Sequence, residues 1–131
     1  MKILVFNGSP KKVRSDTMHI TRAFLDGMNK AAPQEVQSVD VADLNIEFCR
    51  GCFACKYNGG HCVIDDDMRM ILERMLASDL LLFSFSLYCY GMPAMLKNLI
   101  ERTLPLSSMA MARRTGAMST SGSGIIRISD I

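Results

Sequence analysis

The chain has 131 residues, which is enough for a single domain with a modest core. Hydrophobic residues make up 49% and charged residues 21% of the chain, and the net charge of +2 excludes a strongly basic nucleic-acid-binding surface. No apolar run is long enough to span a membrane, and the opening residues lack the features of a signal peptide. We therefore expect a cytoplasmic protein with no nucleic-acid or membrane partner, whose cysteines stay reduced.

The first half of the chain predicts a strand, a helix and a second strand. Residues 2–6 form an apolar run that stops at an Asn-Gly-Ser-Pro turn, which is typical of a buried strand entering a loop. Apolar residues then recur at helical spacing from Met18 to Ala32, and a proline follows. Residues 35–41 carry valines at 36, 39 and 41 and suit a second strand.

The second half predicts a helix, a strand and a further helix. An acidic run at 65–67 favours a helix start, and an amphipathic helix follows with its apolar side at Met68, Ile71, Leu72, Met75 and Leu76. Residues 80–85 are typical of a strand covered on both faces. Pro93 begins the last helix, whose apolar side is formed by Leu96, Leu99, Ile100 and Thr103.

This alternation predicts an α/β fold with a doubly wound parallel sheet in three α/β/α layers. We expect one domain over 1–131, with a clear pattern over 1–106 and an unclear tail over 107–131, where 116–120 and 125–129 are candidate short strands. Ligands bind such folds at the carboxyl ends of the strands. The loops that follow the first and third strands are therefore candidate sites.

The loop after the first strand is rich in hydroxyls and cations, and it leads into a helix. A helix start offers free backbone N–H groups and a positive dipole end, which together attract an anion. The residues that suit a phosphate group are Ser9, Lys11, Arg14, Ser15 and Thr17. The alternative is a solvated loop in which Ser15 caps the helix.

Four cysteines, Cys49, Cys52, Cys55 and Cys62, lie in one short segment in which Gly51, Gly59 and Gly60 supply turns. Soft sulfur ligands select iron–sulfur clusters or zinc over hard cations. The first three follow the spacing of bacterial [4Fe–4S] runs. Structural zinc and unligated thiols remain the alternatives. The fifth cysteine, Cys89, lies far from this motif.

The loop after the third predicted strand carries two tyrosines and a glycine before a helix N-terminus. Such a loop suits a flat, hydrogen-bonding ring such as a flavin, and its N–H groups could stabilise the negative charge of a reduced flavin. The alternative is that the tyrosines only line the boundary between core and surface. The candidate residues are Ser86, Leu87, Tyr88, Cys89, Tyr90, Gly91 and Met92.

Together these segments resemble the flavodoxin-like NADPH-dependent FMN reductase family, and within it the iron–sulfur flavoproteins. Residues 8–17 resemble the phosphate loop of that family, 49–68 its compact cysteine motif, and 77–102 the segment that carries the isoalloxazine loop. The resemblance covers residues 1–106. One departure is Asp16, which stands where the family usually has asparagine and places a carboxylate near the phosphate.

The resemblance implies FMN on the two loops, a [4Fe–4S] cluster on the four cysteines, and NAD(P)H as electron donor. It further implies a small molecule or a protein as electron partner, and a homo-oligomer, a dimer or tetramer, with FMN near the subunit interface. The family's chain usually continues for two more strand–helix units, so this chain is expected to be truncated or divergent at its C-terminus. We therefore expect an FMN-dependent oxidoreductase. The alternative is a non-catalytic flavodoxin-like module whose cysteines hold zinc or nothing.

Overall fold

A computed structural model describes residues 1–107, and the candidate strands at 116–120 and 125–129 lie outside this part. Its sheet has three parallel strands, β1 (Lys2–Asn7), β2 (Glu35–Asp40) and β3 (Leu80–Ser84). The strand order is β2-β1-β3, so the first strand of the chain lies between the other two. The carboxyl ends of β1 and β3 are therefore neighbours.

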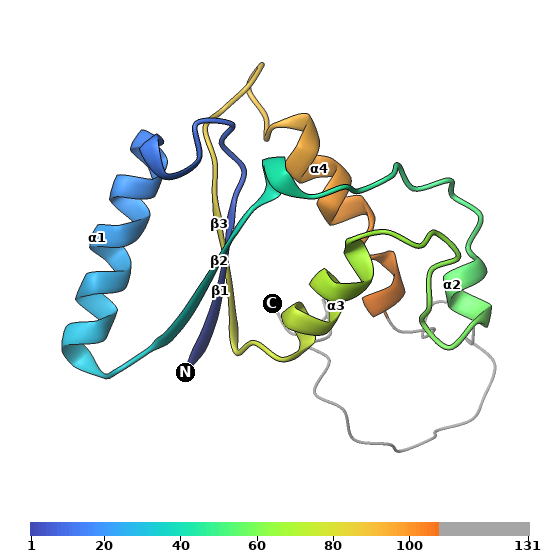
Figure 1. Ribbon diagram of the computed structural model, residues 1–131, viewed down its shortest axis with the longest axis horizontal. Coiled ribbons are helices and arrows are strands. Elements are labelled where there is room, and N and C mark those ends of the chain that lie inside the picture. Colours follow the sequence, from blue (N-terminus) through green and yellow to red (C-terminus); the bar gives the residue numbers. More distant parts are fainter. Residues whose placement is uncertain (108–131) are drawn as a thin grey trace.

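Helices cover both faces of this sheet (Figure 1). α1 (Asp16–Ala31) lies on one face, and α3 (Met68–Leu76) and α4 (Ala94–Glu101) lie on the other. A single helical turn, α2 (Ala54–Tyr57), lies within the cysteine segment. The α/β class and the flavodoxin-like three-layer α/β/α arrangement predicted from the sequence are thus confirmed.

β1 is the centre of the core because both of its faces are covered. Ile3 and Val5 pack with Met18 and Leu25 of α1, since alternate residues of a strand point to the same side. Leu4 and Phe6 point the other way, into a larger cluster formed with α3 and α4. This cluster contains Met68, Ile71, Leu72, Met75, Leu96 and Leu99.

Three details differ from the sequence prediction. Leu76 is 65% exposed, because it is the last residue of α3 and lies beyond the part that packs on the sheet. Leu80 to Phe83 are only partly buried, because β3 is an edge strand of the sheet formed by residues 1–107. The second strand ends at Asp40, and Val41 begins a short 3₁₀ turn.

The last helix also departs from the expected pattern. Leu96 and Leu99 are buried as predicted, but Thr103 lies beyond the end of α4. The polar residues Asn98 and Arg102 are buried instead, because the backbone and a carboxylate of the segment before α3 supply partners for them.

Candidate functional site

The structure brings two of the three predicted loops together at the carboxyl ends of β1 and β3. The Gly8 N–H donates to the carbonyl oxygen of Ser84 at 2.8 Å, which joins the first loop to the end of β3. The hydroxyl of Thr21, in α1, donates to the Ser84 hydroxyl at 2.9 Å. The loop over 8–15 and the loop over 85–93 therefore share one edge of the sheet.

Two of the hydroxyl side chains of the first loop are buried. Ser9 and Ser15 are only 2% and 1% exposed. Asn7, which is also buried, accepts the Ser9 N–H at 3.1 Å through its side-chain oxygen and donates to Asp40 at 2.7 Å. Asn7 is not among the site residues predicted from the sequence. Its signal is a polar residue that ends an otherwise apolar strand.

Ser15 precedes α1, yet its side chain makes no capping hydrogen bond. Its hydroxyl instead lies 2.7 Å from that of Thr17 in the first turn of the helix. Two hydroxyls therefore meet at the N-terminus of a 16-residue helix. The position suits an anion, since the helix dipole and the first N–H groups favour negative charge there.

Of the three cations in this loop, one forms an ion pair and two form none within residues 1–107. The ammonium group of Lys12 pairs with Asp43, whose hydrogen bond and charge raise the pKa of Lys12. Lys11 and Arg14 are exposed and form no ion pair within residues 1–107. They remain the candidates for neutralising a phosphate. Asp16 is exposed at the first position of α1.

The loop after β3 contains a tight, strained turn. Tyr88 and Gly91 exchange both backbone hydrogen bonds, at 2.8 and 2.9 Å. The two residues between them, Cys89 and Tyr90, have φ angles of 46° and 64°. Such angles are those of a type I′ turn, which normally carries asparagine and glycine. Tyr90 is fully exposed, and Leu87 and Met92 are exposed beside the turn.

The four cysteines of the second predicted site line one small pocket of about 20 Å³. Cys55 is buried and Cys62 half-buried, whereas Cys49 and Cys52 are exposed. Gly51, Gly59 and Gly60 all have positive φ, so they do supply the turns. Within residues 1–107, however, no three histidine, cysteine, aspartate or glutamate side chains are arranged to hold a metal ion. The donor set suits a soft metal centre, but its sulfurs are not gathered around one point.

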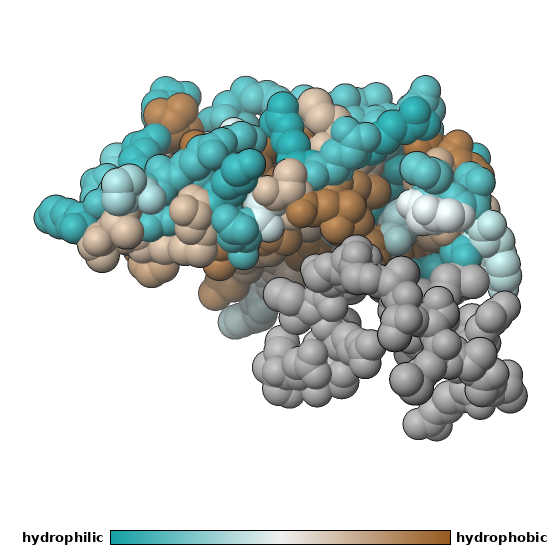
Figure 2. Space-filling view, turned by 90° about the horizontal axis from the view of Figure 1, so that it is seen from below, coloured by the Kyte–Doolittle hydropathy of each residue, from teal (hydrophilic) through white to brown (hydrophobic). Residues whose placement is uncertain are grey.

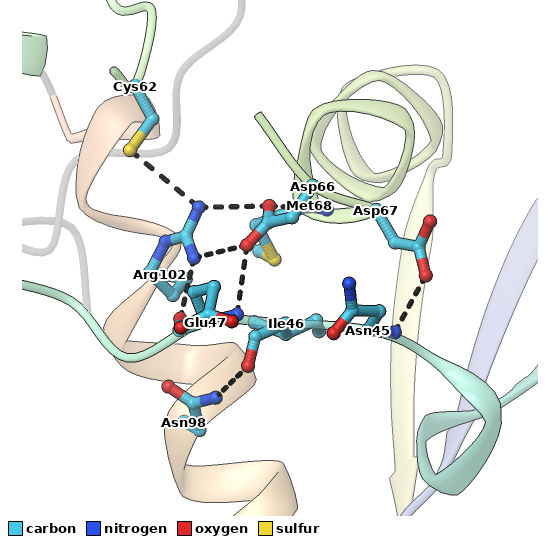
Figure 3. Close-up of polar contacts among 9 residues, drawn as sticks. All are labelled: Asn45, Ile46, Glu47, Cys62, Asp66, Asp67, Met68, Asn98 and Arg102. Carbon is cyan, nitrogen blue, oxygen red and sulfur yellow. Dashed lines mark hydrogen bonds and ion pairs between the residues drawn. The ribbon is translucent and has the colours of Figure 1, made fainter. Parts of the chain in front are cut away.

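A buried ion pair lies where the cysteine segment begins and ends (Figure 3). Arg102 follows α4, Asp66 precedes α3, and their side chains are 2% and 1% exposed. Two N–H groups of the guanidinium contact the carboxylate at 2.6 and 3.0 Å. One of them also donates to the Glu47 carbonyl at 2.6 Å, and the other lies 3.7 Å from the sulfur of Cys62.

The carboxylate of Asp66 also accepts N–H groups from both sides. Glu47 donates to it at 2.9 Å and Met68 at 3.1 Å. Burial alone would raise the pKa of Asp66, but these bonds and those from Arg102 outweigh burial and lower it. Burial would likewise lower the pKa of Arg102, and the bond and charge of Asp66 raise it. Both groups are therefore held in their charged forms.

The hydrogen bonds around Asp66 and Arg102 form a clamp on the segment that enters the cysteine loop. Two neighbouring residues add further hydrogen bonds to this segment. Asn98 of α4 donates to the Ile46 carbonyl at 2.8 Å, and Asp67 accepts the Asn45 N–H at 2.7 Å. The sequence predicts Asp66 and Asp67 at a helix start, but it predicts no structural role for Asn98 or Arg102. The signal for Asn98 is a polar residue between the buried Leu96 and Leu99.

The two candidate centres lie at opposite ends of α4. The strained turn at 88–91 leads into the N-terminus of α4, whereas Glu101, Arg102 and Leu104, at and beyond its C-terminus, line the cysteine pocket. The helix has eight residues, so its axis spans roughly 12 Å. Within the described part of the chain, no helix is long and apolar enough to cross a membrane.

Comparison with known proteins identifies relatives of this architecture. Residues 1–129 match the model of the NADPH-dependent FMN reductase family. The chain is 33% identical over 126 residues to an iron–sulfur flavoprotein from Methanosarcina thermophila, covering 94% of this chain and 64% of that one. It is 32% identical over 108 residues to an iron–sulfur flavoprotein from Methanocaldococcus jannaschii, covering 81% of this chain and 53% of that one.

The fold also has solved counterparts. The NAD(P)H:quinone oxidoreductase from Methanothermobacter marburgensis aligns with a TM-score of 0.64 at 20% identity, over 79% of this chain and 53% of that one. This chain thus spans only part of the length of its relatives. By the family match over almost its whole length, the chain belongs to the NADPH-dependent FMN reductase family, and its curated relatives include iron–sulfur flavoproteins.

Proposed function

We propose that this chain is the FMN-binding part of an NAD(P)H-dependent oxidoreductase of the FMN reductase type. The observation that carries the proposal is the meeting of two loops at one sheet edge, with buried hydroxyls at the start of α1 and a strained aromatic turn opposite. Ser9, Ser15 and Thr17 would hold the phosphate group, and Lys11 and Arg14 would neutralise it. The residues from Ser86 to Met92 would contact the flavin ring.

FMN, when bound, supplies redox chemistry that connects two-electron donors with one-electron acceptors. The side chains of this site need not act as acids or nucleophiles. Their work is to bind the phosphate, orient the ring and offer N–H groups to its polar edge. NAD(P)H as the donor and a small molecule or protein as the other partner are supported by the family to which the chain belongs.

Within the same proposal, Cys49, Cys52, Cys55 and Cys62 hold an iron–sulfur cluster. The support is that all four line one pocket and that the curated relatives named above are iron–sulfur flavoproteins. The second candidate is a non-catalytic module whose cysteines hold zinc or nothing. It is favoured by the observation that, in residues 1–107, the sulfurs do not converge to a metal-binding arrangement.

An ultraviolet–visible spectrum and metal analysis of anaerobically purified protein distinguish the iron–sulfur flavoprotein from the non-catalytic module. We expect flavin bands, a broad iron–sulfur absorbance, and both iron and acid-labile sulfide. Cys52→Ser should lose most of the iron, whereas the matched variant Cys89→Ser, outside the cysteine pocket, should keep it. Stoichiometric zinc without sulfide, or no metal, would remove the cluster from the proposal.

The flavin assignment has its own test, because the phosphate loop should recognise the phosphate rather than the ring. FMN should bind far more tightly than riboflavin in an equilibrium titration. Equal affinity for the two ligands would contradict the assignment of Ser9, Ser15 and Thr17.

A further inference from the structure

Arg102 is oriented toward the cysteine pocket by partners that are not cysteines. Its guanidinium is almost fully buried, and Asp66 grips it with two N–H···O bonds at 2.6 and 3.0 Å. The Glu47 carbonyl accepts a further bond at 2.6 Å. A planar guanidinium held at three points by a carboxylate and a carbonyl has little freedom to rotate. Its direction is therefore fixed by the fold, independently of any metal.

The remaining contact of this fixed group is with one sulfur. Nη2 of Arg102 lies 3.7 Å from Sγ of Cys62, which is within reach of an N–H···S hydrogen bond (Figure 3). In the described part of the chain, Cys62 alone among the four cysteines has a side-chain hydrogen-bond partner. Cys49 and Cys52 are exposed and accessible to water. The centre is therefore asymmetric, with one sulfur held by a buried cation.

We propose that Arg102 is a positioning residue for the cysteine centre. It holds Sγ of Cys62 in the pocket and, when Cys62 ligates as a thiolate, donates to that sulfur a charge-assisted hydrogen bond. A donor to a ligand sulfur stabilises the extra negative charge of the reduced cluster, so Arg102 raises its reduction potential. This inference rests on the proposed function, in which the four cysteines hold a cluster.

The test is the reduction potential of the cluster in anaerobically reconstituted protein, measured by a dye-mediated titration followed by absorbance and electron paramagnetic resonance. Arg102→Gln removes the positive charge and the paired N–H donors of the guanidinium. We expect its reduction equilibrium constant to fall about tenfold, a shift of about 59 mV for a one-electron couple. Arg102→Lys keeps the charge but cannot bond Asp66, Glu47 and Cys62 together, so its potential should fall by a smaller amount.

Two further variants separate positioning from a general structural role. Arg69→Gln removes the same charge from an exposed ion pair with Asp65, and its potential should match the wild type because water screens that pair. Asp66→Asn removes a negative charge beside the cysteines, while the Glu47 carbonyl and the new amide oxygen can still accept N–H groups from Arg102, so the potential should rise. A residue that only stabilises the fold would not give opposite shifts in the Arg102 and Asp66 variants.

The outcomes distinguish this inference from the proposed function. Wild-type protein that takes up no iron and sulfide removes the cluster from the proposed function and overturns the role of Arg102 with it. A loaded wild type whose potential is unchanged by Arg102→Lys and Asp66→Asn overturns only the role of Arg102. If Arg102→Gln does not fold, the lysine variant decides the question, because it retains the charge that Asp66 requires.

Discussion

The ion pair between Asp66 and Arg102 shows what single residues contribute to this molecule. Both side chains are almost completely removed from water, and desolvating two charges is costly unless each finds several partners. Asp66 accepts bonds from Arg102 and from two backbone N–H groups, which meets this condition. Losing one partner would leave a buried charge, so the pair is far more sensitive to substitution than an exposed ion pair.

Asp66→Asn should lower the free energy of unfolding at pH 7 by about 3–5 kcal/mol. The pKa of Asp66 is lowered in the folded state, so its stabilisation is fully present above the unfolded pKa of about 4. It is lost as the pH falls through the lower, folded pKa. The difference in the free energy of unfolding between wild type and variant, measured by urea denaturation, should therefore become smaller below about pH 4.

The matched control is Asp65→Asn, which removes a neighbouring carboxylate from an exposed i,i+4 pair with Arg69. Its effect should stay below about 0.5 kcal/mol. If the two variants lost the same stability, the buried pair would have no special role.

Tyr90 supplies a second prediction at the scale of one residue. Its φ of 64° is a conformation that glycine adopts freely and tyrosine does not, at a cost on the order of 1 kcal/mol. Tyr90→Gly should therefore raise the free energy of unfolding by about that amount in urea denaturation. FMN affinity should fall at the same time, because the variant lacks the ring proposed to contact the flavin.

Tyr57→Gly is a suitable control, because Tyr57 is also exposed but lies at the end of α2 without a positive φ. It should give no gain in stability. A loss of stability in Tyr90→Gly would show that the aromatic ring packs more strongly than the turn is strained.

At the scale of the elements, the decisive contact is the one between the first loop and the start of α4. Gly8 follows β1, and a Cβ atom there would lie 3.1 Å from Cβ of Phe85 and 3.2 Å from a methyl carbon of Leu96. Glycine thus allows the β1–α1 connection to touch the β3–α4 connection. The two halves of the proposed flavin site depend on this close approach.

Gly8→Ala should therefore destabilise the protein by about 1–3 kcal/mol, because Phe85 or α4 must shift to make room. FMN affinity, measured by fluorescence titration, should fall with it, since the loops move apart. Gly27→Ala is the matched change: it lies in α1 with nothing within 4 Å of the added Cβ. That variant should gain about 0.5–1 kcal/mol.

The three strands and the helices α1, α3 and α4 can be predicted from sequence because each carries its own local pattern, whereas the single turn of α2 is not predicted. Buried Met68, Ile71, Leu72 and Met75 recur at helical spacing, and this spacing is independent of the rest of the chain. The burial of Arg102 could not be predicted in this way. Its carboxylate partner lies 36 residues earlier in the chain, so no local window contains both groups.

For the candidate site too, local features can be predicted from the sequence, whereas contacts between distant residues cannot. The hydroxyls of the first loop and the four cysteines can be identified by residue type and spacing. In the structure, the hydroxyls of Ser15 and Thr17 lie 2.7 Å apart, and the four cysteines line one pocket although their sulfurs do not converge within residues 1–107. Which of the cations Lys11, Lys12 and Arg14 form an ion pair within residues 1–107 could not be predicted, because they differ only in what the fold brings to them. Asp43 lies in the short 3₁₀ turn that follows β2, and of these three cations it pairs with Lys12.

At the scale of the whole molecule, the described residues leave apolar surface without cover. β3 has a neighbour on one side only within residues 1–107, and Ile20 and Phe24 are exposed one turn apart on α1. Figure 2 shows hydrophobic residues in the middle of the described surface seen from below, beside a band of hydrophilic residues along its upper margin. Exposed apolar patches of this kind often mark contact surfaces. The homo-oligomer implied by the family resemblance stays a prediction.

Sedimentation velocity should therefore give a species of at least two chains over a range of concentrations. If the flavin loop lies at the subunit interface, Leu87→Ser should shift the distribution toward the monomer, because Leu87 is exposed beside the strained turn. Phe53→Ser, on the cysteine segment, serves as the comparison. A monomer at every concentration would contradict the expected assembly.

The clamp at Glu47 and Asp66 has a consequence for how this protein can change over evolution. The cysteine segment begins at Glu47 and ends at Asp66, and both residues are bonded to Arg102 just beyond α4, so the residues between them form a closed loop. Doubling the length of such a loop costs only about 0.6 kcal/mol of closure entropy. The length and spacing of the residues between Glu47 and Asp66 can therefore change at low entropic cost, without disturbing the loops at the other end of the helix.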